Sequence, residues 1–205
     1  DGFRVDYRRA STFAEGVEAH VRETGSAQVV LMQPTDHGFA APLREAVARA
    51  GGELVVVPNE LWITEEEEFD DWAVGRKTLR LEYFYRAARK KRGWLMEAGK
   101  PLGGRWNFDA ENRRTPESGH RFPDAPRFEP DALTRSVIDE VEGRWPNHFG
   151  STTDFAWPVT RSDALDALDD FLRRRLVSFG PFEDAIVEAE NVLYHSLLSV
   201  PLNLG

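Results

Sequence analysis

Cysteine is absent from the 205-residue sequence. Within these residues, its absence excludes disulfide bonds, thiolate-ligated zinc or iron–sulfur centres, and a cysteine nucleophile. Long apolar runs are absent too. None approaches the roughly 18 residues of a membrane-spanning helix, so we expect no membrane partner. The five histidines never stand three or four residues apart, which argues against a helical metal pair, and we assign no metal ligands.

Two motifs of phosphate-binding and catalytic loops are also missing. No Gly-x-Gly-x-x-Gly follows a predicted strand, and Gly-x-Ser-x-Gly does not occur. The glycine pairs at 51–52 and 103–104 are interpreted as backbone features rather than phosphate cradles. We therefore assign no catalytic residue. No signal peptide is seen, and we expect a cytoplasmic protein.

The residues that are present indicate a globular protein. Apolar residues make up 41% of the sequence and aromatic residues 11%. The length fits one large domain or two small ones with a real core. Residues 1–7 contain no Met and already have the pattern of an approach to a strand, so we expect this chain to be a piece of a longer protein.

Charge is distributed unevenly along the chain. The formal net charge is -9, yet residues 75–114 contain twelve basic and four acidic residues and so carry +8. Such a segment could attract nucleic acid, because neutralising phosphates releases counterions. It could equally pair with the acidic remainder of the same chain. The sequence leaves both interpretations open.

The first third of the sequence has the alternation of a parallel α/β sheet. Strands are predicted at 3–8, 28–32 and 54–58, and helices at 11–24 and 38–50. The run at 28–32 is almost continuously apolar, as expected for a strand buried on both faces. Together these elements predict an incomplete doubly wound parallel sheet.

The pattern then becomes helical. Two capping boxes, Thr64 with Glu67 and Thr160 with Asp163, predict helix starts. The helix that begins at Thr160 is predicted to end before Gly180.

Three further helices are predicted at 78–92, 130–145 and 183–196. In the first of them, Leu81 and Phe84 are expected to face inward. Residues 99–126 are rich in Gly and Pro and predict a connection between domains.

Two polar segments could bind a ligand. The loop at 103–113 combines Asn, Arg and aromatic residues, and binding residues concentrate in loops. Alternatively, its aromatic residues fix the loop to the core while Asn107 and Asn112 cap backbone groups. The second segment, at 194–199, places small hydroxyls at the predicted end of a helix. That arrangement suits a phosphate, or it simply caps the helix.

Several motifs occur in the order found in one known family. They are Gly-Arg-Lys-x-Leu-Arg-x-Glu-x-Phe-Tyr-Arg at 75–86, Gly-Trp-Leu-Met at 93–96, Gly-Gly-Arg-Trp-Asn-Phe-Asp-Ala-Glu-Asn-Arg at 103–113, Phe-x-Trp-Pro-Val-Thr-Arg at 155–161, Phe-Gly-Pro-Phe-Glu-Asp-Ala at 179–185 and His-Ser-Leu-Leu-Ser-x-x-Leu-Asn-x-Gly at 195–205. By these motifs the chain resembles the prokaryotic iron–sulfur photolyase/cryptochrome family, also called deoxyribodipyrimidine photolyase-related proteins.

The resemblance implies a fold and a domain order. Residues 1–98 would be part of an α/β antenna domain, 99–129 an interdomain linker, and 130–205 the first helices of an all-α FAD-binding domain. It also implies light-driven electron transfer from reduced FAD that repairs pyrimidine photoproducts in damaged DNA, the (6-4) type in particular. The antenna pigment would be 6,7-dimethyl-8-ribityllumazine, and a 4Fe-4S cluster would be held by cysteines that this sequence lacks.

The resemblance also implies site residues. His195-Ser196-Leu197-Leu198-Ser199 corresponds to the Thr-Ser-x-Leu-Ser stretch through which photolyases hold the FAD pyrophosphate. Ser196 and Ser199 are the main candidates, with His195 and Leu198 beside them, and Asn203 is a further candidate. With most of the FAD cavity missing, we expect the isolated 205 residues to retain no cofactor and to be inactive. Phe182 stands where related proteins more often have Tyr.

Three functions remain open on the sequence alone. The first is part of a photolyase-like enzyme. The second is a blue-light-sensing cryptochrome-like flavoprotein without repair activity, which nothing in these residues separates from the first. The third is a free-standing α/β binding module.

Overall fold

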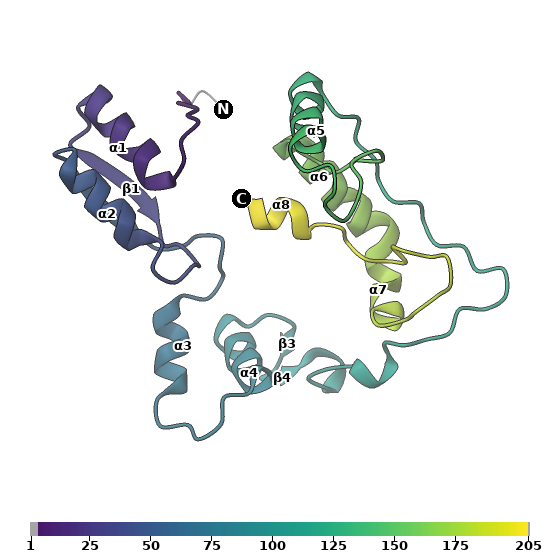
Figure 1. The fold of residues 1–205 in the computed structure, drawn as a ribbon. Helices are drawn as coiled ribbons and strands as arrows, with labels where there is room; N and C mark the ends of the chain where they lie inside the picture. The colour runs from purple at the N-terminus through teal and green to yellow at the C-terminus, as the bar shows by residue number, and fades with distance from the viewer. Residues whose placement is uncertain (1–3, 205) are drawn as a thin grey trace. The chain divides into compact units, whose positions relative to one another are not determined.

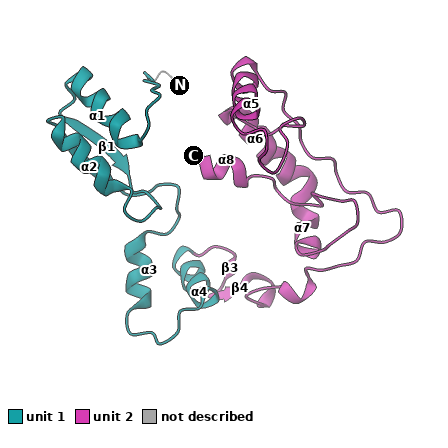
Figure 2. Ribbon diagram, viewed as in Figure 1, with its two compact units in different colours: residues 1–92 teal, residues 93–205 magenta. Residues whose placement is uncertain are grey.

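The computed structural model describes residues 4–204. Helices and strands are mixed, which agrees with the predicted α/β class (Figure 1). The chain forms two compact units, Asp1–Arg92 and Gly93–Gly205, which we call unit 1 and unit 2 (Figure 2).

Helix α1 (Phe13–Thr24) starts and ends as its sequence predicts. Thr12 caps the start, because its Oγ1 accepts a hydrogen bond from the backbone N–H of Glu15 at 3.2 Å. Gly25 follows the last turn with a φ of 66°, a left-handed conformation that glycine adopts without strain. The helix contributes Val21 to the core.

A two-stranded parallel sheet carries the core of unit 1. Strand β1 (Gln28–Met32) pairs with β2 (Glu53–Val57), and helix α2 (Ala40–Arg49) makes the crossover between them. The buried cluster consists of Val21, Leu43, Val47 and Leu54. Because α1 and α2 both contribute to this one cluster, they cover the same face of the sheet.

The other face of the sheet is left open by the described residues. Exposed and half-buried residues alternate along β1, and Val30 is 60% exposed. The prediction that this strand is buried on both faces is therefore wrong, because both helices pack on the side of Val29 and Leu31. A doubly wound sheet has helices on both faces, and it is not confirmed.

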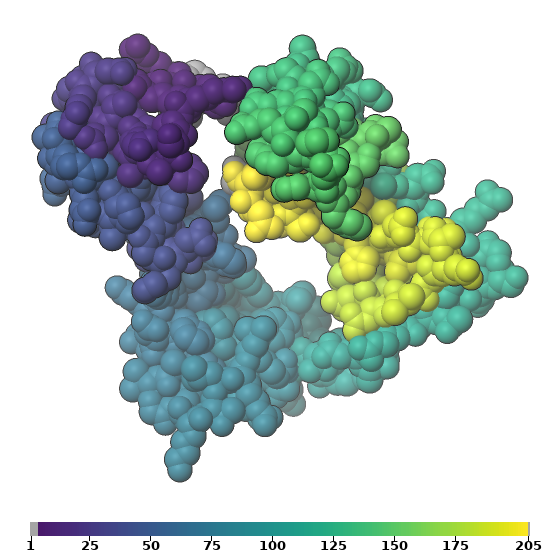
Figure 3. Space-filling view, in the orientation of Figure 1, coloured from purple at the N-terminus to yellow at the C-terminus, as the bar shows by residue number. Residues whose placement is uncertain are grey.

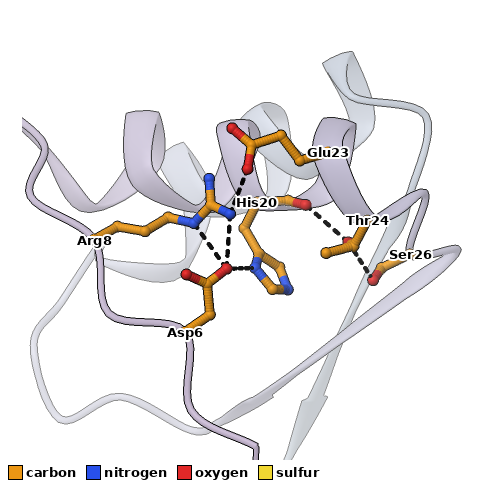
Figure 4. A network of polar contacts seen from close by, with 6 residues as sticks. All are labelled: Asp6, Arg8, His20, Glu23, Thr24 and Ser26. Atoms are coloured by element: carbon orange, nitrogen blue, oxygen red, sulfur yellow. Dashed lines mark hydrogen bonds and ion pairs between the residues drawn. The ribbon is translucent and has the colours of Figure 1, made fainter.

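The strand predicted at 3–8 is also wrong over its described part. Phe3 lies outside the described residues, and residues 4–8 form irregular chain. Among the described residues, β1 and β2 pair only with each other, so residues 4–8 add no third strand to the sheet. Side chains hold this segment against α1 instead (Figure 4). Asp6 Oδ2 lies 2.5 Å from Nδ1 of His20, and Arg8 donates to Glu23 at 2.6 Å.

Helices α3 (Glu66–Ala73) and α4 (Leu81–Arg92) complete unit 1. The predicted inward residue Phe84 is confirmed. Its ring centroid lies 5.3 Å from that of Phe69 and 5.1 Å from that of Trp72. Aromatic pairing between the two helices thus replaces an aliphatic core here.

Two details of these helices differ from the sequence prediction. The N-cap of α3 is Glu65, so Thr64 lies one residue too early to cap the helix, and the predicted capping box is wrong. Leu81 is 80% exposed rather than inward, because α4 begins at this residue and its first turn extends beyond the aromatic contact.

Unit 2 begins with short elements. Strands β3 (Met96–Glu97) and β4 (Lys100–Pro101) form an antiparallel pair, followed by two 3-10 turns, η1 (Leu102–Gly104) and η2 (Asp109–Glu111). Residues 112–131 contain no helix or strand. The Gly- and Pro-rich stretch is therefore mostly irregular, as predicted.

The longer helices of unit 2 follow. They are α5 (Ala132–Arg144), α6 (Arg161–Asp170), the π-helical turn η3 (Phe171–Arg175), α7 (Leu176–Phe182) and α8 (Ser199–Leu204). The predicted cap at Thr160 is confirmed, since its Oγ1 accepts a hydrogen bond from the N–H of Asp163 at 3.1 Å. Helix α6, η3 and α7 run on without a break.

Two helix predictions in this unit are wrong. Gly180 does not stop the helix, which continues to Phe182. The helix predicted at 183–196 is replaced by turns, in which Ala189 and Leu193 have positive φ values of 66° and 52°. Such left-handed residues interrupt a helix. Leu193 and Tyr194 are 5% and 8% exposed, so contacts with other segments override the local helical pattern.

Candidate functional site

The five site residues chosen from the sequence lie in one stretch of unit 2. Residues 193–198 are irregular chain, and α8 begins at Ser199. We call residues 193–203 the C-terminal segment, and Figure 3 shows its atoms, in yellow, at the surface of its unit. The hydroxyl of Ser196 therefore precedes a short helix and that of Ser199 lies on its first residue, whereas the sequence pattern predicts both at the end of a helix.

Ser196 and Ser199 present the hydroxyl groups of this segment. The Oγ of half-buried Ser196 accepts a hydrogen bond from the N–H of Leu198 at 3.4 Å, which leaves its own proton available to donate. Ser199 is exposed. Its carbonyl accepts from Nδ2 of Asn203 at 2.7 Å, so the amide of Asn203 is already engaged within α8. The two serines are thus better placed to donate to a ligand than Asn203.

His195 is exposed and lies on the same segment. Its ring meets that of Phe179 edge to face, with centroids 5.5 Å apart, and its backbone N–H donates to the carbonyl of Val192 at 3.0 Å. The ring is thus packed on one side and open to solvent on another. Leu198 is half-buried, and its carbonyl accepts from the N–H of Leu202 in the first turn of α8.

The backbone of this segment is constrained. Leu193 and Leu197 have φ values of 52° and 60°. A side-chain-bearing residue in this region is strained and persists only where its surroundings hold it. The serine between them is therefore displayed by a backbone that other parts of the unit determine.

An apolar cavity of about 170 Å³ adjoins the segment. Leu197 and Val192 line one part of its wall, and Trp157 and Phe128 line another. Its lining is mostly apolar, so the cavity suits an apolar or planar group rather than a charged one.

Aromatic side chains hold the start of the segment. Tyr194 packs against Phe122 and Phe182 at centroid distances of 5.2 and 5.5 Å. Its hydroxyl lies 3.0 Å from Nε2 of His120. The ring of Phe182 is buried among these aromatic side chains.

The Asn- and Arg-containing loop at 103–113 docks on the end of α7. Nδ2 of Asn112 donates to Oδ2 of Asp184 at 3.1 Å, and Nη2 of Arg113 donates to the same oxygen at 2.9 Å. Asn112 is 7% exposed, and its Oδ1 is buried without a hydrogen-bond partner among the described residues. The predicted role of Asn112 as a cap for backbone groups is therefore wrong, because its side chain ties the loop to the carboxylate of Asp184.

The basic residues of α4 pair with acidic residues of their own unit. Lys91 and Arg92 reach the carboxylate of Glu68 on α3 at 3.0 and 2.8 Å. Hydrogen bonds from Arg92 and Lys91 lower the pKa of Glu68 to about 2. Arg86 pairs with Glu82 one turn earlier on the same helix, at 2.7 Å. For these residues the structure favours internal pairing over an open nucleic-acid surface.

One residue near the site was missed from the sequence. Arg175 is 1% exposed, and its Nη1 donates to the carbonyl of Leu193 at 3.3 Å. The three consecutive arginines at 173–175 were the available signal, because successive residues of a helix point in different directions and one of three can face the interior.

Residues 4–204 lack two further features. This part of the chain contains no group of three or more His, Asp or Glu residues that could hold a metal ion. None of its helices is both long enough and apolar enough to cross a membrane.

Comparison with known proteins gives two matches. A sequence model of the family "Deoxyribodipyrimidine photo-lyase-related protein" matches residues 1–157. A (6-4) photolyase of Agrobacterium fabrum is 36% identical over 211 aligned residues, which cover all of this chain and 42% of that protein. The chain thus spans less than half the length of this relative. Both matches agree with the motifs at 75–113, and the chain belongs to the deoxyribodipyrimidine photolyase-related protein family.

Proposed function

We propose that this chain is part of a flavin-dependent photolyase that repairs pyrimidine photoproducts in DNA by light-driven electron transfer, with the (6-4) photoproduct as substrate. The observation that carries the proposal is the alignment with a (6-4) photolyase along the whole chain. Its proposed partner is damaged DNA, and its proposed location is the cytoplasm.

FAD is the proposed cofactor, and the residues present fit its pyrophosphate. Ser196 and Ser199 offer hydroxyl donors. No acidic residue occurs between positions 191 and 205, so a phosphate would meet no like charge within this segment. When bound, FAD supplies the electron-transfer chemistry. The serines would hold its phosphates with His195 and Leu198 beside them, and Asn203 stabilises the turn that presents Ser199.

The proposed domain order follows the family resemblance. Residues 1–98 form part of the antenna domain, which would take 6,7-dimethyl-8-ribityllumazine. Residues 99–129 form the linker, and residues 130–205 start the FAD-binding domain. The parallel pair β1–β2 with its crossover helix α2 supports the α/β assignment of the first part.

The 4Fe-4S cluster does not fit the residues of this chain. Such a cluster is held by cysteine thiolates, and the sequence contains none.

The phosphate assignment is tested with the gene product at its natural length. In the variant Ser196→Ala/Ser199→Ala, loss of two hydrogen bonds to a charged group should weaken flavin binding at least about tenfold. The matched control is Ser136→Ala/Ser151→Ala, which removes two serine hydroxyls from elsewhere in unit 2. Flavin occupancy after gel filtration is the measurement. Equal occupancy in the two double variants would refute the assignment.

The reaction is tested separately. The flavin-loaded gene product should convert an oligonucleotide containing a single (6-4) photoproduct to the undamaged sequence under blue light and not in the dark. A protein that binds and photoreduces flavin but leaves the lesion intact would instead be a blue-light sensor, and the repair proposal would be wrong.

A further inference from the structure

Arg175 differs from the two arginines that precede it. The side chains of Arg173 and Arg174 are 76% and 51% exposed and pair with Asp169 and Asp170 one turn earlier. The side chain of Arg175 is 1% exposed, which makes it the largest fully buried side chain among the described residues. A buried guanidinium needs acceptors for its donors, so its surroundings are informative.

Those acceptors come from three separate parts of unit 2. Nε donates to Oδ2 of Asp170 at 2.8 Å, and Nη1 donates to the carbonyl of Leu193 at 3.3 Å. Nη2 donates to the carbonyls of Pro123 and Asp124, at 3.2 Å to the former. One side chain therefore joins the helix, the irregular chain after residue 112 and the start of the C-terminal segment.

The π-helical turn makes this pairing possible. Asp170 pairs with Arg174 at the α-helical spacing of four and with Arg175 at a spacing of five. A π-turn widens the helix by one residue, which brings residue i+5 alongside residue i. The turn thus directs Arg175 into the unit while its neighbours remain in solvent.

The charges around Arg175 also indicate that it is needed inside unit 2. Burial raises the pKa of Asp170, but hydrogen bonds from Arg175 and Arg174 outweigh it, so the pKa lies below its ordinary value and the carboxylate stays ionised. Removing Arg175 would leave the half-buried carboxylate with only Arg174 as a cationic partner, and the three carbonyls would each lose a donor.

The contact with Leu193 is the one that bears on function. Leu193 has a left-handed φ of 52°, and the carbonyl that Arg175 holds lies three residues before Ser196. A strained residue of this kind persists because surrounding contacts over-determine it. Arg175 is the charged contact that does so here.

We propose that Arg175 is a positioning residue for the phosphate-bearing cofactor: by fixing the backbone at Leu193, it presents Ser196 and Ser199 in the binding conformation. The inference rests on the proposed function, because it takes the C-terminal segment as the phosphate site. Lysine cannot replace the residue, since a single ammonium group lacks the planar set of donors that reaches all four acceptors.

The test compares Arg175→Lys and Arg175→Met with the control Arg173→Met in the gene product at its natural length. Peptide-resolved hydrogen exchange of residues 193–199 is the first measurement, flavin affinity the second and melting temperature the third. In both Arg175 variants, hydrogen exchange of the 193–199 peptide should be at least about tenfold faster than in the wild type, with the α5 peptide as the internal reference. Flavin binding should be at least about fivefold weaker. Arg173→Met should change neither quantity.

The outcomes separate the two proposals. If the Arg175 variants lower the melting temperature while exchange in 193–199 and flavin affinity per folded molecule stay at the control level, Arg175 has only a structural role and the inference fails. If exchange and affinity change together while the double serine variant binds flavin normally, the phosphate assignment fails and the ordering of the segment by Arg175 stands. Where Arg175→Met does not fold, Arg175→Lys supplies the same comparison.

Discussion

The two units of this protein are ordered in different ways. Unit 1 has a regular βαβ core, in which Val21, Leu43, Val47 and Leu54 are at most 5% exposed. In unit 2 a buried arginine, a buried asparagine and an aromatic cluster join segments distant in sequence. Hydrophobic packing therefore orders the first unit, whereas polar anchors order the chain around the proposed site in the second.

The largest expected effect tests the core of unit 1. Leu54→Ala should destabilise this unit by about 2 to 5 kcal/mol, because it removes buried methyl groups and leaves a cavity beside Val47. Val30→Ala, on the exposed side of the same sheet, should cost well under half as much. Urea unfolding followed by hydrogen exchange of the β1 and β2 peptides measures both. Equal losses would mean that the core is not where unit 1 gains its stability.

A glycine pair compares close packing in unit 1 with open space in unit 2. A Cβ at Gly52 would lie 3.0 Å from the carbonyl oxygen of Ser26 and 3.2 Å from Cγ1 of Val47, so Gly52→Ala should cost about 1 to 3 kcal/mol. A Cβ at Gly143, within α5, would meet nothing within 4 Å.

The second member of the pair should therefore change stability in the opposite direction. Gly143→Ala should stabilise α5 by about 0.5 to 1 kcal/mol, because alanine reduces the freedom of the unfolded chain. Thermal unfolding of the two variants gives the sign of each change. A destabilising Gly143→Ala would show that α5 is packed more tightly than its exposed Leu133 and Val137 indicate.

The smallest effect concerns the surface ion pairs of unit 1. Hydrogen bonds from Arg92 and Lys91 lower the pKa of Glu68 from 4.5 to about 2 in the folded protein. The contribution of this pairing to the stability of unit 1 is therefore at its full size above pH 4.5. That contribution should be lost as the pH falls from 4.5 through 2. In Glu68→Gln it should be absent at every pH. Stability curves of the wild type and Glu68→Gln should converge in acid, and parallel curves would contradict the assignment.

The sequence predicted the first unit better than the second, for physical reasons. The strands at 28–32 and near 54–58 and the helix ended by Gly25 depend on local periodicity and caps, and they are confirmed. The strand at 3–8 fails because pairing requires a neighbour, which a local pattern does not reveal.

The helix caps show that a shift of one residue can make a sequence prediction wrong. Thr64 and Thr160 both begin predicted capping boxes, yet only Thr160 caps its helix. The start of α3 shifts by one residue, to Glu65, and a shift of that size lies beyond what residue types alone decide.

The candidate site shows the same limit. The family motif identified Ser196 and Ser199, but the irregular path of 183–198 depends on Tyr194 meeting an aromatic cluster and on Arg175 reaching Leu193 across 18 positions. Contacts over such separations leave no periodic trace in the sequence. The motif therefore predicted which residues to examine, and the structure was needed to find what orients them.

The open side of the β1–β2 sheet has a practical consequence. Val30 and Met32 lie exposed on a strand whose described partner is β2 alone, and apolar strands with free backbone groups are templates for pairing with other molecules. We expect concentrated solutions of these 205 residues to self-associate through this surface despite a net charge of -9. The solubility of the isolated chain would then be limited by two apolar side chains of one strand rather than by its acidic composition.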